Sequence, residues 1–258
     1  MPTEPSPGSE FSATSSTQAA QVKNAEESWA QKLEKTDIPG LIKLLSDPDH
    51  EIRSSAACCL GDKVRTKELR EFSHKLKETL AQRLKDPSGQ VRFEAAIALA
   101  EMQDIRATGC LASFLPKSTH RLDAIRSLGA SGDTLAIVAL KPYVERWWYP
   151  WADRLQAAAA LCRLGNSLGM EYLQDRITCR RREEKCAAYY FLGESNHPEA
   201  LSLLQSGLKS GPNHIKHSCI DGLGALATPQ AWATLQKISD DAQGEVQEHA
   251  QEILNRAR

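Results

Sequence analysis

Apolar and polar positions recur along this chain in a pattern of ten residues. The first position is apolar or polar and the second is basic. Two variable positions follow, then two small apolar residues and two more variable positions, and the pattern ends with leucine and then glycine or alanine. The clearest copies occupy residues 52–61 and 91–100, and further copies begin at His120, Asp153, Glu184, Ile215 and Val246. The last four copies follow one another at a constant spacing of 31 residues. Such a constant spacing indicates an internal structural repeat.

A second apolar stretch precedes each copy. In residues 38–45, 198–204 and 229–235 the apolar side chains fall at i, i+3, i+4 and i+7, which is the period of an α-helix. Turn and capping residues separate the two stretches in the first repeats, as in Asp47-Pro48-Asp49. No segment alternates with a period of two, so we expect pairs of helices and no strands. Because an isolated pair cannot bury both apolar faces, successive pairs are predicted to stack.

The turn aspartate, the Ile-Arg or Val-Arg lead, the Ala-Ala pair and the Leu-Gly exit together resemble the HEAT family. They are most similar to the short bacterial HEAT-like repeats first described in phycobilin lyases. The resemblance covers about residues 37–258 and implies an all-α fold, an α-solenoid of about seven HEAT-like helix pairs. It specifies the architecture and says very little about function.

Two regions are expected from the composition along the chain. Residues 1–22 are rich in proline, serine and threonine and are predicted to form a disordered tail. Residues 23–258 are predicted to form the HEAT-like solenoid domain, in which residues 24–35 form an N-terminal capping helix through Trp29 and Leu33. The first two repeats are separated by a longer spacing, and we assign the excess, residues 63–77, to an extended connection that runs into the first helix of the second pair.

Charge and cysteine content narrow the class of protein. The 32 basic and 33 acidic residues leave a net charge of −1, which disfavours nucleic acid as a partner. No apolar run approaches the roughly 18 residues of a membrane span, so we expect no membrane insertion, and no secretory signal opens the chain. The seven cysteines form no CxxC pair, which favours reduced thiols in a cytoplasmic protein.

A basic residue stands at the second position of six copies, and we call this set the ladder. It could form a basic stripe that binds an anionic partner. The HEAT resemblance favours the other interpretation, in which each basic side chain pairs with a turn aspartate of its own or the adjacent repeat. We therefore predict a structural ladder, whose members are Arg53, Arg92, Arg121, Arg154, Lys185 and Lys216.

The second helix of each pair is expected to expose positions four, seven and eleven of the pattern, which share one side of a helix. Charges of both signs mix on this groove face, as is ordinary for a protein-binding surface. We expect Arg126 and Tyr190 to contact a partner there. In the middle repeats the face comprises Asp123, Arg126, Ala130, Gln156, Ala159, Arg163, Ala187, Tyr190 and Glu194.

Two neighbouring turns concentrate residues that favour binding. One contains Trp147, Trp148, Tyr149 and Trp151, and tryptophan and tyrosine dominate binding hot spots. The alternative is that these rings fill a gap where Pro142 kinks or splits the preceding helix. The other turn contains Arg180, Arg181 and Arg182, which could clamp a carboxylate or phosphate and should lie near the first turn.

The sequence contains few residue patterns typical of catalytic sites, so we expect no catalytic residues, no metal site and no cofactor. Deoxyhypusine hydroxylases resemble this architecture and hold two irons with several His-Glu pairs, whereas this chain has one, His50-Glu51. We predict a scaffold, adaptor or assembly factor that binds another protein. The alternatives are an enzyme subunit that resembles phycobilin lyases and handles a tetrapyrrole, and nucleic-acid binding. A small-molecule ligand is thus left open.

Overall fold

The computed structural model describes residues 33, 35–65 and 73–256. Every regular element in these residues is an α-helix, so the prediction of an all-α fold is confirmed. The expected tail at residues 1–22 lies outside the described residues. Of the expected capping helix only Leu33 and Lys35 are described, and Leu33 is buried. No described helix is long and apolar enough to cross a membrane.

The chain divides into two compact units, and the boundary between Ala98 and Leu99 falls inside helix α5. The first unit holds two helix pairs. Their members are α2 (Ile38–Leu44), α3 (His50–Arg65), α4 (Ser73–Arg83) and α5 (Gly89–Glu101). Helix α2 begins where the Asp37 carboxylate accepts a hydrogen bond from the Gly40 amide. Such a cap satisfies a backbone donor that the first helical turn leaves free.

The extended connection expected over residues 63–77 is described only at its two ends. Helix α3 continues to Arg65 and α4 begins at Ser73, so both described ends of this segment are helical. Residues 66–72 lie outside the described part of the chain. Leu76 of α4 is fully buried in the first unit.

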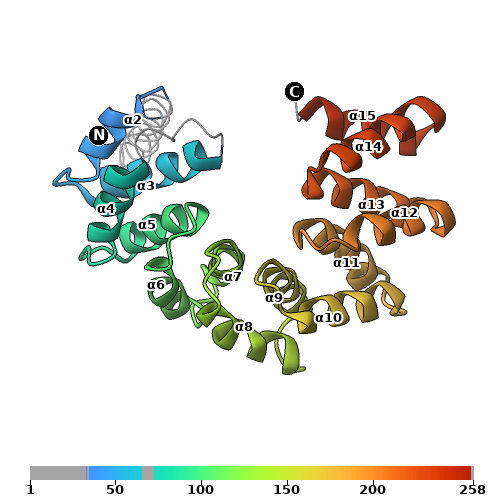
Figure 1. Cartoon of the computed structure of the whole chain (residues 1–258), viewed down its shortest axis with the longest axis horizontal. Helices are drawn as coiled ribbons and strands as arrows, with labels where there is room; N and C mark the ends of the chain where they lie inside the picture. The colour runs from blue at the N-terminus through green and yellow to red at the C-terminus, as the bar shows by residue number, and fades with distance from the viewer. Residues whose placement is uncertain (1–32, 34, 66–72, 257–258) are drawn as a thin grey trace, which may run out of the picture. The chain divides into compact units, whose positions relative to one another are not determined.

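The second unit stacks five helix pairs (Figure 1). Their members are α6 (Ala107–Phe114), α7 (Arg121–Ala130), α8 (Leu135–Glu145), α9 (Trp151–Arg163), α10 (Ser167–Thr178), α11 (Arg182–Glu194), α12 (Ala200–Ser210), α13 (Asn213–Leu226), α14 (Pro229–Asp241) and α15 (Glu245–Arg256). The second helix of each pair packs on the second helix of the next pair, from α7 through α9, α11 and α13 to α15. This order is that of an α-solenoid, as predicted.

Small residues set how closely the second helices approach. The Ala-Ala pair of the pattern is fully buried in α9 at Ala157 and Ala158. Between α11 and α13 the contact is closer still, because Gly193 and Gly222 face each other. A Cβ added to Gly193 would lie 1.9 Å from the carbonyl oxygen of Gly222. The repeat therefore leaves room for a neighbouring backbone at this interface.

Helix α8 contains Pro142 and yet continues from Leu135 to Glu145. Pro142 was expected to kink or split this helix, and the expectation of a split is wrong. Proline removes one backbone donor, whose acceptor would be the carbonyl of Val138. The Val138 side chain itself is exposed. The loss of one hydrogen bond in the last helical turns does not end the helix.

Candidate functional site

The turn between α8 and α9 exposes three tryptophans, which we call the aromatic edge. The exposed fractions are 80% for Trp147, 59% for Trp148 and 39% for Trp151. Trp147 packs edge-on against Trp148, with ring centroids 6.2 Å apart and an interplanar angle of 84°. The guanidinium carbon of Arg146 lies 5.5 Å from the Trp148 ring centroid. The edge thus combines open aromatic area with a positive charge.

Tyr149 has a different role from the three tryptophans beside it. Its ring stacks on Tyr143 of α8 with centroids 4.2 Å apart. Tyr143 is buried, and its hydroxyl donates a hydrogen bond of 3.2 Å to the carbonyl oxygen of Leu115. Burial raises the pKa of the Tyr143 hydroxyl, so the hydroxyl stays protonated and able to donate. This stack holds the turn and lets the tryptophans face outward.

The arginine turn at residues 180–182 is only partly neutralised. Arg181 is the N-cap residue of α11, and its guanidinium donates to Glu184 at 2.8 Å. Glu184 is 4% exposed and also accepts a hydrogen bond of 3.4 Å from Arg176. Arg180 and Arg182 are exposed. The buried carboxylate of Glu184 therefore fixes one arginine and leaves the other two open to solvent.

A row of side chains connects the two turns. Arg154 of α9 donates to the carbonyl of Val144 at 3.3 Å, and its guanidinium lies 5.0 Å from the Tyr172 ring centroid. Arg176 lies over the same ring at 5.3 Å and reaches Glu184 beneath the arginine turn. The ladder residue Arg154 thus contacts an aromatic ring of the next repeat, where an aspartate was expected.

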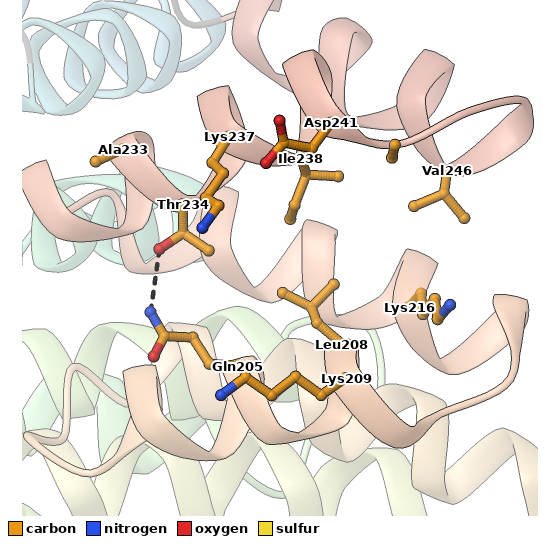
Figure 2. A pocket seen from close by; sticks show the side chains of 11 residues that line it. Gln205, Leu208, Lys209, Lys216, Ala233, Thr234, Lys237, Ile238, Asp241 and Val246 are labelled. Carbon is orange, nitrogen blue, oxygen red and sulfur yellow. Dashed lines mark hydrogen bonds between the residues drawn. The ribbon is translucent and has the colours of Figure 1, made fainter.

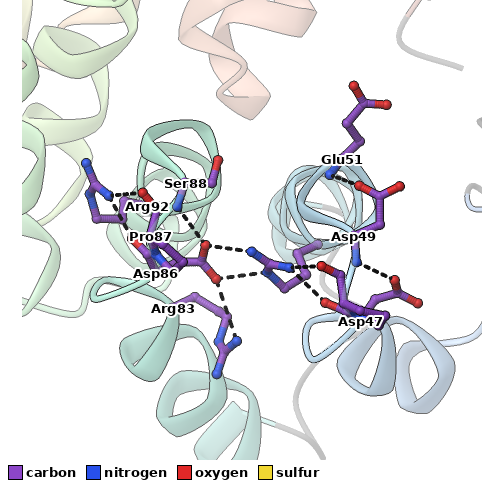
Figure 3. Close-up of polar contacts among 10 residues, drawn as sticks. Asp47, Asp49, Glu51, Arg83, Asp86, Pro87, Ser88 and Arg92 are labelled. Atoms are coloured by element: carbon purple, nitrogen blue, oxygen red, sulfur yellow. Dashed lines mark hydrogen bonds and ion pairs between the residues drawn. The ribbon is translucent and has the colours of Figure 1, made fainter.

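In the first unit, the ladder residue Arg53 binds Asp86, the turn aspartate of the adjacent repeat. Figure 3 labels Asp86 and the preceding turn residue Asp47. Arg53 donates to Asp86 through Nε and Nη2, each at 2.9 Å, and through Nη1 to the carbonyls of Asp47 and Pro48 in its own turn. Arg92 donates to the carbonyl oxygens of Asp86 and Pro87 at 2.7 and 3.0 Å.

In the second unit, the partners of the ladder residues differ from repeat to repeat. Arg121 pairs with Asp153 at 2.9 Å and donates to the carbonyl of Leu115. Lys185 and Lys216 occupy the equivalent place in α11 and α13, and neither ammonium group has an ion pair or hydrogen bond within the described residues. The six ladder residues therefore do not all make the same kind of contact.

The groove face is less regular than the pattern predicts. Arg126 and Tyr190 are exposed, and they lie close enough that Arg126 affects the pKa of Tyr190. Burial raises that pKa, the Glu194 carboxylate raises it further, and Arg126 opposes both. Gln156 and Ala159 were expected on this face but are 5% and 1% exposed. They lie on α9, which packs between α7 and α11.

Sequence reasoning missed a cavity of about 690 Å³ in the second unit (Figure 2). Helices α12 and α14 form its long walls, and the first turns of α13 and α15 border it. In the sequence, lysine replaces arginine at the last two ladder positions, Lys185 and Lys216, and Lys216 lines this cavity. The lining residues are Gln205, Leu208, Lys209, Lys216, Ala233, Thr234, Lys237, Ile238, Asp241, Ala242 and Val246.

The ten-residue pattern places Asp221 and His249 on the groove face but does not predict that they pair. His249 of α15 binds the Asp221 carboxylate of α13 at 2.8 Å, and the His217 ring lies 5.1 Å from the His249 ring. Across the described residues, no group of three or more histidine, cysteine and acidic side chains is arranged to hold a metal ion. All seven cysteines carry free thiols.

This chain matches one family model and is similar to known proteins. A family model for HEAT repeats matches residues 38–120 and 77–162. The chain is 30% identical over 135 residues to the protein YibA of Escherichia coli (strain K12), a match that covers 52% of this chain and 44% of YibA. The chain thus spans less than half the length of that relative. It is 24% identical over 236 residues to deoxyhypusine hydroxylase of Homo sapiens, covering 68% of this chain and 78% of that protein.

Among solved structures, the chain is similar to the complex of CpcE and CpcF of phycocyanin lyase from Nostoc sp. PCC7120. The TM-score is 0.52 and the identity 19%, and the match covers 86% of this chain and 95% of that chain. At this level of identity the likeness shows the fold alone.

Proposed function

We propose that this chain, whose residues 38–162 match a family model for HEAT repeats, is a scaffold or assembly factor that binds another protein. The aromatic edge is the proposed anchor, and the groove face formed by α7, α9 and α11 extends the contact. The free thiols support action in a reducing compartment, which we propose is the cytoplasm. No catalytic step is assigned to the protein.

The observation that carries this proposal is the exposure of Trp147 and Trp148 on an ordered turn. Large apolar side chains in a row are rarely left open to water unless they contact something. Tryptophan contributes a large contact area at a small cost in conformational entropy, and it is enriched at binding hot spots. Because the Tyr149–Tyr143 stack already orders the turn, little further order is lost when a partner binds.

The groove face supports the same role through mixed charge. Arg163 donates to Glu194 at 3.0 Å, and the Tyr190 hydroxyl donates to the same carboxylate at 3.1 Å. Arg126 stands near this group with its guanidinium exposed. Such a surface of paired charges with an open aromatic ring offers hydrogen-bond donors and apolar area to a protein partner.

The proposal is tested by affinity capture from the native cell, followed by binding measurements on the protein that is captured. Trp148→Ala should weaken that binding by about 2 kcal/mol, roughly thirtyfold. Val138→Ala is the matched control, because Val138 is 74% exposed on α8 outside the edge and should change the affinity less than about twofold. A captured partner that binds the Trp148→Ala protein as tightly as wild type would contradict the proposal.

A tetrapyrrole is the second candidate ligand, because the Trp148 ring lies beside the cation of Arg146. A planar conjugated ring could stack on the indole while its carboxylates approach the guanidinium. The test is an absorbance titration with biliverdin and with haemin. A saturable spectral shift that disappears in Trp148→Ala would favour this ligand over a protein partner. An unchanged absorbance spectrum would exclude a tetrapyrrole as the ligand.

A further inference from the structure

The cavity between α12 and α14 has an apolar interior and a basic rim (Figure 2). Leu208, Ile238 and Val246 are half-buried and form its apolar surface. At one end Gln205 donates a hydrogen bond of 3.2 Å to Thr234, which joins α12 to α14. Its volume of about 690 Å³ falls within the range of binding sites that enclose several side chains or a small ligand.

The repeat pattern explains why the cavity occurs at this place. Asp241 stands six residues before Gln247, as Asp86 stands six residues before Arg92. Lys216 stands at the ladder position that Arg53 occupies in the first unit. Arg53 reaches Asp86 with two hydrogen bonds, whereas Lys216 and Asp241 form no ion pair and both line the cavity. Lysine carries one compact ammonium group and lacks the planar fork that spans such a gap.

The charge around the cavity is unbalanced. Lys209, Lys216 and Lys237 line it, and Asp241 is the one acidic residue in the lining. None of these ammonium groups has an ion pair or a hydrogen bond to another described residue. The rim therefore has positive charges without protein partners beside an apolar interior. That combination is complementary to a ligand with carboxylates next to apolar side chains.

We propose that this cavity binds an acidic amphipathic segment of a partner protein. One or two of its apolar side chains enter between Leu208 and Ile238, and its flanking carboxylates pair with Lys209 and Lys237. A nucleic-acid strand fits less well, because the lining has no aromatic ring on which a base can stack. The site is separate from the aromatic edge, so this inference goes beyond the proposed function and does not depend on it.

The test uses the full chain and a fluorescent synthetic peptide of about 18 residues, or five helical turns. The peptide carries leucine at i, i+3, i+4 and i+7 and glutamate at the other positions. Fluorescence anisotropy should show saturable binding that weakens with added salt, since the contact is partly electrostatic. A scrambled peptide of the same composition, and one in which lysine replaces every glutamate, should bind at least about tenfold more weakly.

The double variant Lys209→Glu with Lys237→Glu should weaken binding of the acidic peptide by at least about tenfold. The matched control is Lys141→Glu on α8, which reverses an exposed lysine outside the cavity and should change the affinity less than about twofold. Both variants should keep the helical circular dichroism and melting temperature of the wild type, because the altered side chains are exposed.

Three results would overturn the inference. They are equal binding of the scrambled peptide, unchanged binding in the double variant, and displacement of the peptide by a short single-stranded DNA at lower concentration than the unlabelled peptide itself. The Trp148→Ala variant should bind the peptide as wild type does. Failure of the aromatic edge as an anchor would thus be distinguishable from failure of the cavity.

Discussion

The guanidinium of Arg53 and the carboxylate of Asp86 form two hydrogen bonds of 2.9 Å across 33 residues of sequence. Arg53 is 8% exposed and Asp86 5% exposed, so the pair is buried between two successive repeats of the first unit. The same carboxylate accepts a hydrogen bond from the Ser88 amide at the start of the next helix. One side chain therefore joins helix α3 to the turn that begins α5. We propose that this is a structural role.

Asp86→Ala is expected to lower the free energy of unfolding by about 3–5 kcal/mol, because it leaves the Arg53 cation buried without its partner. Urea unfolding followed by circular dichroism measures this change. The comparison is Glu252→Ala, whose 3.8 Å pair with Arg256 is exposed on both sides and should contribute at most about 1 kcal/mol. Similar losses of unfolding free energy in the two variants would show that burial does not increase the contribution of the Arg53–Asp86 pair to stability.

The stability of the wild type should depend on pH through Asp86. Burial acts to raise the pKa of this carboxyl, but hydrogen bonds from Arg53 and the Ser88 amide outweigh burial, and the pKa lies below its ordinary value of 3.8. A carboxyl with a lowered pKa stabilises the fold above the pKa of the unfolded chain, and this contribution is lost as the pH falls through the folded pKa.

The free energy of unfolding should therefore decrease below about pH 4. In Asp86→Asn the stability at neutral pH should be lower, and the decrease on acidification should be smaller. An acid profile of the variant that runs parallel to that of the wild type would contradict the assignment of this pH dependence to Asp86.

Gly193→Ala should be strongly destabilising, whereas Gly109→Ala should not. A Cβ on Gly193 would meet the Gly222 carbonyl oxygen at 1.9 Å, so α11 and α13 would have to separate. Overpacking of this kind typically costs about 1–3 kcal/mol. A Cβ on Gly109 in α6 would have no heavy atom within 4 Å, and replacing a helical glycine typically adds about 0.4–1 kcal/mol. Thermal melts of both variants would check these opposite signs.

Tyr149 and Trp147 should respond differently to truncation although they stand two residues apart. Tyr149→Ala removes the ring stacked on the buried Tyr143 and should cost about 2 kcal/mol of stability. Trp147→Ala removes a ring that is 80% exposed and should change stability by less than about 0.5 kcal/mol. A chemical denaturation curve for each variant gives the two values. A large loss in Trp147→Ala would mean that this ring packs on the protein.

The cysteines should fall into fast and slow classes when titrated with a thiol reagent. Burial raises the pKa of Cys162 and of Cys219 to about 12, so neither is a thiolate at pH 8. Cys58 is exposed and should react within the first phase. Cys162 and Cys219 should react only after a denaturant is added, which mass spectrometry of the labelled peptides can follow. Early labelling of Cys219 in the folded protein would contradict its burial.

Much of the fold could be read from the pattern of apolar residues. The repeated second helix, the preceding apolar stretch and the turn between them are all local features, and a local period of 3.6 residues is enough to predict them. The match to HEAT repeats and the helical structure confirm this part. Within the connection expected at residues 63–77, residues 63–65 and 73–77 are helical, because charged residues such as Lys63 and Lys77 are compatible with a helix when its other face is buried.

The exposure of residues in the candidate site depends on side chains of other repeats, which the ten-residue pattern does not include. Ala159 and Tyr190 share position seven of the repeat, yet one is 1% exposed and the other 38%. The pattern predicts the groove face for both. Whether such a residue reaches solvent depends on its own length and on the side chains of the flanking helices, which come from other repeats.

The sequence by itself determined the helix pairs, their order and the places of the turns, because these follow from hydrophobic periodicity and capping within about 30 residues. Only the tertiary structure decided that Trp147 faces solvent while Tyr149 packs on Tyr143. It also decided that Lys216 borders a cavity where Arg53 closes a gap. Exposure and pairing depend on which atoms of other repeats lie within contact distance, and the stacking of the helices brings those atoms together.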